Sequence, residues 1–371
     1  MIFFPLLGGL PDVRQGLGVG KIQIVCLQVS SFMQLHYKKI ELPFEYPFTI
    51  SGGRTKTHQP SLIVALQLGN FIGYGEAPAI TYYNITVEKM IADIEAKKRM
   101  IEKFAFTEPE RYWHYLHHLL PQNPFLASAL DMAAWDLYGK LKGKLLYQIW
   151  NTEFTKIPLT DYTIGIDTIE KMIEKIKDNP LPIYKIKVGF ENDVEVITEL
   201  RKHTDAIFRV DANAGWTLEQ SLEKIPQLND LGVEFIEQPL AKDDWDGMKI
   251  LYQESSLPLL ADESCVFEHD VEKCVNHFHG INIKLTKCSG ITPAIRMIKK
   301  ARELNLKIMM GSMNESSLGA SANANFLPQL DFVDMDGPLL LKEDIATGLE
   351  FNNGKVSITG KYGLGVTLNE W

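Results

Sequence analysis

The chain lacks several features that would place it in common protein classes. Its 371 residues contain no uninterrupted apolar run close to the ~18 residues that a membrane-spanning helix needs. It has 47 acidic and 38 basic residues and a net charge of −9, which does not suit binding to a phosphate backbone. We therefore exclude nucleic acid and membrane as its main partners.

Cysteine is scarce, and the copies at Cys26, Cys265, Cys274 and Cys288 form no CxxC pair and no zinc-like spacing. The apolar start of the chain has no positively charged segment and no small-residue cleavage site of the kind that marks a secretory signal. Both absences indicate a reduced protein, and we expect a cytoplasmic location.

Nucleotide-binding motifs are also missing. No GxGxxG follows a candidate strand, which argues against a Rossmann-type site. The segment GLGVGK at residues 16–21 fails as a phosphate loop, because Gln15 and Ile22 stand where that motif needs Gly and Ser or Thr. Residues 1–32 differ in pattern from the rest, and we interpret them as an N-terminal extension.

The first part of the chain combines a strand pattern with a helical one. Residues 33–76 alternate apolar and polar positions in runs separated by turn residues, which is typical of an antiparallel sheet. Residues 86–150 show helical patterns, and the strongest of these ends at Gly143. We therefore predict an α+β domain over residues 33–150.

From residue 157 onward, short β-branched runs alternate with helical patterns. The candidate strands end near Ile166, Val188, Val210, Ile236, Leu260, Ile283, Met310 and Val333. Polar residues recur at these ends every 22 to 28 residues, the length of one strand, one helix and two short loops. This period predicts a (β/α)₈-type barrel over residues 151–340. An open doubly wound sheet is the alternative, but it normally has fewer strands. Residues 341–371 are expected to pack back on the first domain.

Three consecutive candidate strands end in an acidic residue, at Asp211, Glu237 and Asp262. Because the carboxyl ends of barrel strands form the active face, these carboxylates would repel one another unless a cation lies between them. All-oxygen ligands without His or Cys favour Mg²⁺. The alternative is that each acid caps the next helix, which explains one such residue more easily than three at matched positions.

Lysines flank these acids. Lys185 and Lys187 lie two residues apart and therefore on one face of a strand, and Lys284 ends the sixth strand. The second and sixth strands of an eight-stranded ring are opposite each other, so Lys187 and Lys284 would face a substrate from two sides. A lysine inside a barrel is costly without a partner or a role. We interpret Lys287, by contrast, as a surface residue with its charge in solvent.

This arrangement predicts a class of reaction. A metal ion beside a carboxylate stabilises the enediolate that forms when the α-proton leaves. Bases on both faces allow the proton to be removed from one side and returned on the other. The chemistry would be racemisation or epimerisation.

The motifs DAN at 211–213, EQP at 237–239, DES at 262–264, KxK at 185–187 and the later Lys284 resemble the enolase superfamily, in its muconate-lactonising subgroup. The resemblance extends from about Met33 to the end of the chain. It implies an α/β fold, with an N-terminal α+β capping domain over a (β/α)₇β TIM-type barrel. It also implies one Mg²⁺ per subunit and assembly as a homo-oligomer.

A second acidic pair narrows the subgroup. Asp334 and Asp336 lie two residues apart and share a face after the eighth strand. They resemble the pair with which the family's dipeptide epimerases hold the substrate α-ammonium, a site that muconate cycloisomerases do not need. A strand-end turn is the alternative for this segment.

The resemblance also implies substrate contacts. Thr163 and Ser312 would touch the substrate, and Lys185 would help to hold its carboxylate. Specificity would be read by capping-domain loops at about 48–56 and 77–84. Arg54 would read the far end of the C-terminal side chain, unless it is a solvated loop arginine. Ser289 departs from the family pattern, since relatives often have Gly there, and this puts the shape of its loop in doubt.

These observations favour a Mg²⁺-dependent dipeptide epimerase. It would invert the α-carbon of the C-terminal residue of small Ala-containing dipeptides, such as Ala-Ala or Ala-Glu from peptidoglycan. The alternatives are another enzyme of the subgroup, namely a muconate cycloisomerase, an N-acyl amino acid racemase or a succinylbenzoate synthase, and a non-catalytic relative that kept the fold. A mandelate-racemase-like enzyme is disfavoured, because it would need His in place of Lys284.

Overall fold

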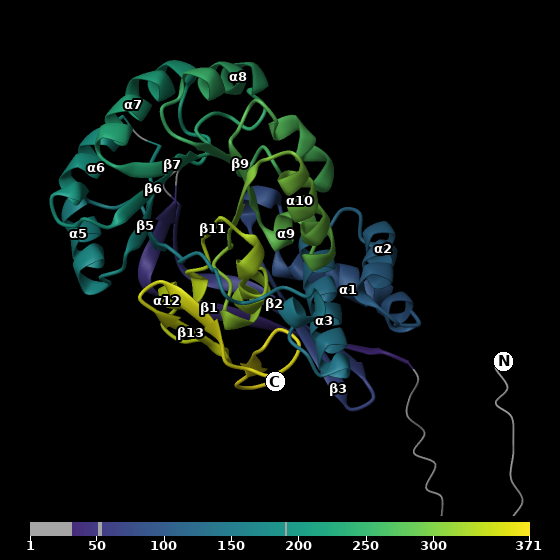
Figure 1. Cartoon of the computed structure of the whole chain (residues 1–371). Helices are drawn as coiled ribbons and strands as arrows, with labels where there is room; N and C mark the ends of the chain where they lie inside the picture. The colour runs from purple at the N-terminus through teal and green to yellow at the C-terminus, as the bar shows by residue number, and fades with distance from the viewer. Residues whose placement is uncertain (1–31, 51–53, 190) are drawn as a thin grey trace, which may run out of the picture.

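The structure, a computed structural model, describes residues 32–50, 54–189 and 191–371 (Figure 1). The predicted extension over residues 1–32 lies outside them apart from its last residue, and so does the middle of the predicted loop 48–56.

The first domain begins with an antiparallel sheet, as the alternating pattern predicts. Strands β1 (Gln34–Ile50), β2 (Arg54–Leu68) and β3 (Phe71–Pro78) pair in the order β1-β2-β3. Apolar side chains of β1 and β2 such as Leu35 and Leu66 face each other in register and are fully buried. This sheet therefore has one face against a core, which fixes its register.

Helices cover that face of the sheet. Helices α1 (Val87–Glu102) and α3 (Pro124–Lys142) contact its strands, and α2 (Pro109–Leu119) packs on α3. A short 3₁₀ turn η1 (Thr81–Tyr83) precedes them, and α4 (Leu146–Ile149) follows α3. Helix α3 lies directly on β3, where a Cβ at Gly75 would come within 2.0 Å of the Ala129 carbonyl oxygen. The helix ends as predicted, because Gly143 adopts a left-handed conformation at φ 63°.

The second domain contains eight parallel strands, and each ends within two residues of its predicted position. They are β4 (Tyr162–Ile164), β5 (Ile183–Lys187), β6 (Ile207–Asp211), β7 (Val233–Glu237), β8 (Leu259–Ala261), β9 (Gly280–Ile283), β10 (Lys307–Met310) and β11 (Phe332–Val333). They pair in chain order, and a parallel bridge between Thr160 and Val333 joins the two ends of the curled sheet. The TIM-type barrel is confirmed.

Helices surround this barrel (Figure 1). They are α5 (Ile169–Asp178), α6 (Asp193–Arg201), α7 (Leu218–Asp230), α8 (Trp245–Glu254), α9 (Leu285–Cys288), α10 (Ile291–Glu303), α11 (Ser317–Ala324) and α12 (Gly337–Leu340), with a 3₁₀ turn η4 (Leu327–Gln329). Between β8 and β9 the predicted helix is replaced by 3₁₀ turns η2 (Glu268–Asp270) and η3 (Glu272–Cys274). There, Asp270 accepts hydrogen bonds from the backbone N–H groups of Val266 and Phe267, which competes with a regular helix.

The C-terminal segment contacts the first domain. It contains β12 (Ala346–Thr347), β13 (Leu349–Asn352), β14 (Lys355–Ile358) and β15 (Thr367–Leu368). Leu341 forms an isolated antiparallel β-bridge with Phe44 of β1. The Leu364 N–H donates a 2.9 Å hydrogen bond to the buried Asp136 of α3.

The lower part of the barrel interior is filled by side chains. Phe235, Leu260 and Met309 form a buried cluster with Phe332. The guanidinium of Arg209 lies 5.4 Å from the Phe235 ring and 5.3 Å from the Phe332 ring. The barrel is therefore closed from below, and any cavity must open at the carboxyl ends of its strands.

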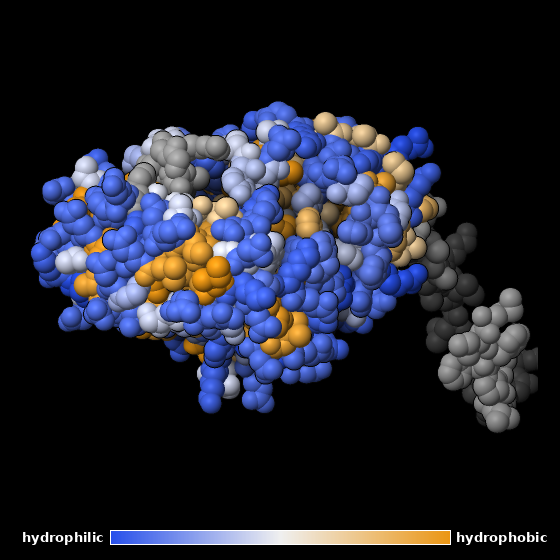
Figure 2. All heavy atoms as spheres, turned by 90° about the horizontal axis from the view of Figure 1, so that it is seen from above, coloured by the Kyte–Doolittle hydropathy of each residue, from blue (hydrophilic) through white to orange (hydrophobic). Residues whose placement is uncertain are grey.

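The face of the molecule seen in Figure 2 is mostly hydrophilic, with apolar side chains in separate patches. No helix within the described ranges is long and apolar enough to cross a membrane.

Candidate functional site

A cavity of about 330 Å³ lies at the carboxyl ends of the barrel strands, where the first domain covers them. Its walls come from both domains. The first domain contributes Lys56, Ile80, Tyr82 and Tyr83, and the barrel contributes Thr163, Lys185, Lys187, Asn213, Asp262, Glu263, Lys284, Ser312, Met313, Asn314, Asp334 and Asp336.

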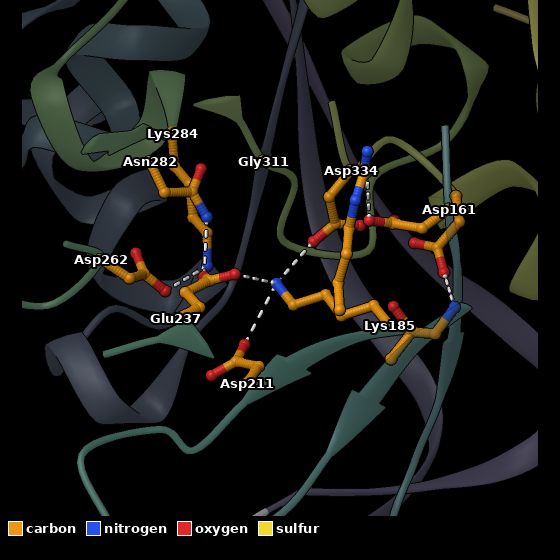
Figure 3. A network of polar contacts seen from close by, with 12 residues as sticks. Asp161, Lys185, Asp211, Glu237, Asp262, Asn282, Lys284, Gly311 and Asp334 are labelled. Atoms are coloured by element: carbon orange, nitrogen blue, oxygen red, sulfur yellow. Dashed lines mark hydrogen bonds and ion pairs between the residues drawn. The ribbon is translucent and has the colours of Figure 1, made fainter. Parts of the chain in front are cut away.

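The three acidic residues that the sequence singles out lie together (Figure 3), and Asp262 among them lines the cavity. Asp211 and Glu237 end neighbouring strands and are partners in register, and Asp262 directly follows β8. All three side chains are fully buried. Lysine ammonium groups lie among these carboxylates. In the described ranges, no group of three His, Cys, Asp or Glu side chains is arranged so that it could hold a metal ion.

Lys185 is the centre of this cluster. Its Nζ lies 3.1 Å from Asp211 Oδ2, 2.8 Å from Glu237 Oε2 and 2.8 Å from Asp334 Oδ2 (Figure 3). Burial alone would lower the pKa of Lys185, but the surrounding carboxylates outweigh it and hold this pKa well above its usual value. Lys185 is therefore a fixed positive charge.

The other two lysines reach the same cavity from different strands. Lys187 Nζ, at the end of β5, lies 2.5 Å from Asp211 Oδ2, and Lys284 Nζ, directly after β9, lies 2.7 Å from Asp262 Oδ2. The bridge between Thr160 and Val333 places β4 beside β11 in the ring. Three strands then lie between β5 and β9 in either direction, so these two strands are opposite each other. Burial would lower the pKa of Lys284, but the neighbouring Asp262 outweighs this and raises it.

The acidic pair after β11 also lines the cavity, and its two members differ. Asp334 contacts Lys185, which outweighs the effect of burial and lowers the pKa of Asp334. Asp336 Oδ2 accepts a 2.5 Å hydrogen bond from the Thr163 N–H. Burial, with the Asp334 carboxylate adding to it, raises the pKa of Asp336 to about 7.

The remaining predicted residues have different outcomes. Ser312 and Thr163 line the cavity. Arg54 begins β2, but its side chain lies outside the part of the chain that the structure describes. Lys56, two residues further on, lines the cavity. Ser289 adopts a left-handed conformation at φ 72°, so the loop keeps a shape that usually favours Gly.

The interpretation of Lys287 as a surface residue is wrong. Its side chain is fully buried, and its Nζ donates to Asp262 Oδ1 at 2.5 Å. Lys287 lies in the short helix α9, and its Nζ also reaches the carbonyls of Cys265 and Asn282. No pattern in the sequence marks this burial, because Lys284 is still extended and the helix that follows it has only four residues.

Asn282 and Glu263 are further residues that the sequence reasoning missed. Asn282 Nδ2 donates a 2.8 Å hydrogen bond to Glu237 Oε1. Strand alternation could have found it, because it lies two residues before Lys284. Glu263 lines the cavity, and burial, with Asp262 and Asp211 adding to it, raises its pKa to about 8.

The chemistry of this cluster fits a hard divalent cation. Its donors are buried carboxylate oxygens, which are the ligands that Mg²⁺ prefers. Buried oxygens such as Glu263 Oε2 and Asp334 Oδ1 have no hydrogen-bond donor among the described residues. Buried carboxylates need positive charge nearby to offset their own. Among the described residues, the lysines provide that charge at this cluster.

Comparison with known proteins gives consistent matches. The family model described as "Enolase C-terminal domain-like" matches residues 168–371. An L-Ala-D/L-amino acid epimerase of Maribacter sp. (strain HTCC2170) is 53% identical over 339 residues, which cover 91% of this chain and 100% of that protein. An L-Ala-D/L-Glu epimerase of Bacteroides thetaiotaomicron is 37% identical over 342 residues, covering 91% of this chain and 88% of that protein.

Solved structures agree with these matches. A substrate-liganded complex of the L-Ala-D/L-Glu epimerase from Bacillus subtilis is 30% identical, with a TM-score of 0.85, and the match covers 90% of this chain and 98% of that one. A dipeptide epimerase from Cytophaga hutchinsonii, complexed with Mg and D-Ala-L-Val, is 28% identical, with a TM-score of 0.85 and coverage of 91% and 96%.

Proposed function

The chain belongs to the enolase superfamily, and from this premise we propose that it is a Mg²⁺-dependent dipeptide epimerase. The observation that carries the proposal is the pair of lysines, Lys187 and Lys284, that reach one cavity from opposite strands with buried carboxylates between them. The enzyme is an isomerase, like its relatives that are named epimerases.

Asp211, Glu237 and Asp262 are the residues that would hold Mg²⁺. When bound, the ion supplies positive charge beside the substrate carboxylate and so stabilises the negative charge that develops as the α-proton leaves. Lys185 would hold the substrate carboxylate from the other side, because its ammonium is fixed among acids at the base of the cavity.

Lys187 and Lys284 would move the proton. One of them, as a neutral amine, takes the α-proton from its face of the substrate, and the other, as an ammonium, gives a proton to the opposite face. The α-carbon of the C-terminal residue is inverted, since only that carbon is adjacent to a free carboxylate. In the structure each amine contacts a carboxylate, which it must leave to act as a base.

Asp334 and Asp336 would bind the α-ammonium of the dipeptide, beside Thr163 and Ser312. A charged donor paired with a buried carboxylate makes a strong hydrogen bond. Neither a muconate cycloisomerase nor an N-acyl amino acid racemase has a substrate ammonium to place there. The other enzymes of the subgroup are therefore disfavoured.

The cavity of about 330 Å³ suits a small dipeptide, and we propose an Ala-containing one of the Ala-Ala or Ala-Glu type. Arg54, in the first capping loop, is proposed to read the C-terminal side chain. A homo-oligomeric state and a cytoplasmic location stay predictions from the sequence.

The test is α-proton exchange in D₂O. The Mg²⁺-loaded enzyme is incubated with L-Ala-L-Ala, L-Ala-L-Glu and other L-Ala dipeptides, and mass spectrometry follows deuterium at the C-terminal α-carbon. We expect one deuterium per molecule together with formation of the L,D epimer. Lack of exchange across the whole panel would contradict the proposal. Failure of the protein to bind Mg²⁺ in calorimetry would favour the non-catalytic relative instead.

A further inference from the structure

We propose that Lys287 is a positioning residue, which fixes the carboxylate of Asp262 in the orientation that the site requires. The inference rests on the proposed function, because it is there that Asp262 becomes a metal ligand. Lys287 does not line the cavity, and its side chain has no exposed area. It therefore acts through Asp262 rather than on the substrate.

The ammonium of Lys287 is enclosed by oxygen atoms. It donates to Asp262 Oδ1 at 2.5 Å, to the Asp262 carbonyl at 2.6 Å, and to the carbonyls of Cys265 and Asn282 at 3.2 Å. A lysine has only three N–H donors, so this set uses all of them. One side chain thus joins the end of β8, the loop after it and the end of β9.

The two oxygens of Asp262 are divided between two lysines. Oδ2 faces Lys284, which lines the cavity (Figure 3). Oδ1 faces Lys287, which does not line it. The Asp262 backbone is held as well, since its N–H donates to Gln238 Oε1 at 3.0 Å. With Oδ1 and the backbone held, only Oδ2 remains directed toward the reacting groups.

In each of the other two acids, one oxygen contacts a lysine and the second oxygen is held by a neutral group. Asn282 Nδ2 donates to Glu237 Oε1 at 2.8 Å, and the Asn213 N–H donates to Asp211 Oδ1 at 2.9 Å. Among these three acids, Asp262 alone has a second cation on the side away from the cavity. Without it, Lys284 would be the nearest partner for the whole carboxylate. Lys287 therefore orients the acid and also leaves Lys284 free to change partners.

The experiment is Mg²⁺ binding by calorimetry to the full chain, with Lys287→Met and Lys287→Gln variants and no substrate. Outer-shell partners of metal ligands typically contribute about 10- to 100-fold in affinity, and we expect Lys287→Met to weaken Mg²⁺ binding by that factor. Lys287→Gln, which keeps a donor for Oδ1, should recover part of the loss. If the role of Lys287 were only its charge, removing a cation would instead tighten Mg²⁺ binding.

Lys140→Met is the matched control. Its ammonium also bonds one carboxylate, Asp136 Oδ2 at 2.7 Å, and one carbonyl, that of Ile72 at 2.8 Å, but it lies in the first domain. The control should lose thermal stability and keep its Mg²⁺ affinity. Unchanged or tighter Mg²⁺ binding in the Lys287 variants would overturn the inference. If Lys287→Met does not fold, the affinity of Lys287→Gln decides alone. Wild-type protein that binds no Mg²⁺ would instead overturn the proposed function.

Discussion

The barrel interior has two charged layers, and one strand, β6, contributes a residue to each of them. In β6, Arg209 and Asp211 lie two residues apart and point to the same side. In the lower layer, Arg209 pairs with Asp161 and Glu234 at 2.8 Å and lies between aromatic rings. In the upper layer, the acids and lysines lie at a cavity of about 330 Å³, and most of them line it.

The difference between the layers is access to the cavity. A buried ion pair repays the cost of desolvation only with good geometry and further hydrogen bonds, and the lower layer has both. Arg209 also donates to the Val333 carbonyl at 3.0 Å, so it joins strands across the ring. In the upper layer, Lys187 and Lys284 line the cavity and can exchange a carboxylate for a substrate. Ion pairs between buried side chains therefore stabilise the fold in the lower layer. In the upper layer, the same kind of ion pair holds the lysines that are proposed to react with the substrate.

The largest expected effect is on catalysis in the upper layer. Replacing Lys284 with Ala removes one base, and a base of this kind contributes about 10²- to 10⁴-fold to the rate. We expect kcat for epimerisation to fall by that factor, with little change in thermal stability, because Asp262 keeps Lys287 as a partner. Steady-state kinetics measures kcat, and a melting curve measures thermal stability. A kcat within about threefold of that of the wild type would contradict a catalytic role for the upper layer.

The lower layer should respond in the opposite way. Arg209→Met leaves the fully buried Asp161 without its cation, and breaking a buried pair costs about 3–5 kcal/mol in the free energy of unfolding. Urea denaturation measures this loss, while kcat of the folded enzyme should stay near that of the wild type. A double variant, Arg209→Met with Asp161→Leu, is the control and should recover most of the stability. A stable but inactive Arg209→Met would show that this layer takes part in catalysis.

Asp336→Asn sharpens the comparison inside the upper layer. The Asn side chain can still accept the hydrogen bond from the Thr163 N–H, but it no longer offers a charge to the substrate ammonium. A hydrogen bond to a charged group contributes about 1.5–3 kcal/mol, so KM for a dipeptide should rise by about ten- to a hundredfold. Arg209→Met should leave KM unchanged. A KM for Asp336→Asn equal to that of the wild type would contradict the ammonium site.

The smallest effect is a pH dependence that only the upper layer should show. Burial and Asp334 raise the pKa of Asp336 to about 7, so this carboxyl is ionised above that pH and protonated below it. Because the ammonium needs the ionised form, kcat/KM should rise as the pH increases through about 7 and fall about tenfold per unit below it. Asp336→Asn should lose this limb of the profile. If kcat/KM of the variant still falls below this pH, another titrating group causes the fall, and its assignment to Asp336 is contradicted.

Much of the upper layer could be predicted from the sequence. The ends of parallel strands meet at one edge, so a period near 25 residues is enough to bring Asp211, Glu237 and Asp262 together. The two-residue alternation of strands likewise places Lys185 with Lys187. Here a regular backbone fixes the direction of the side chains.

The rest depends on irregular backbone. Lys287 lies in a four-residue helix that packs against α3 of the first domain, and so short a helix carries no apolar pattern that would predict its burial. The connection between β8 and β9 forms 3₁₀ turns because Asp270 bonds the backbone locally. Lys56 reaches the cavity because the first domain covers the barrel mouth, and this contact between distant segments leaves no periodic pattern.

The most direct measurement is exchange of the α-proton by single lysine variants in D₂O, with the L,L and L,D epimers of one dipeptide assayed separately. Each variant keeps one amine, which can remove and return the proton on its own side only. Lys187→Ala and Lys284→Ala are therefore expected to exchange opposite epimers without interconverting them. Exchange of the same epimer by both variants would place the two amines on one side of the substrate and contradict the account.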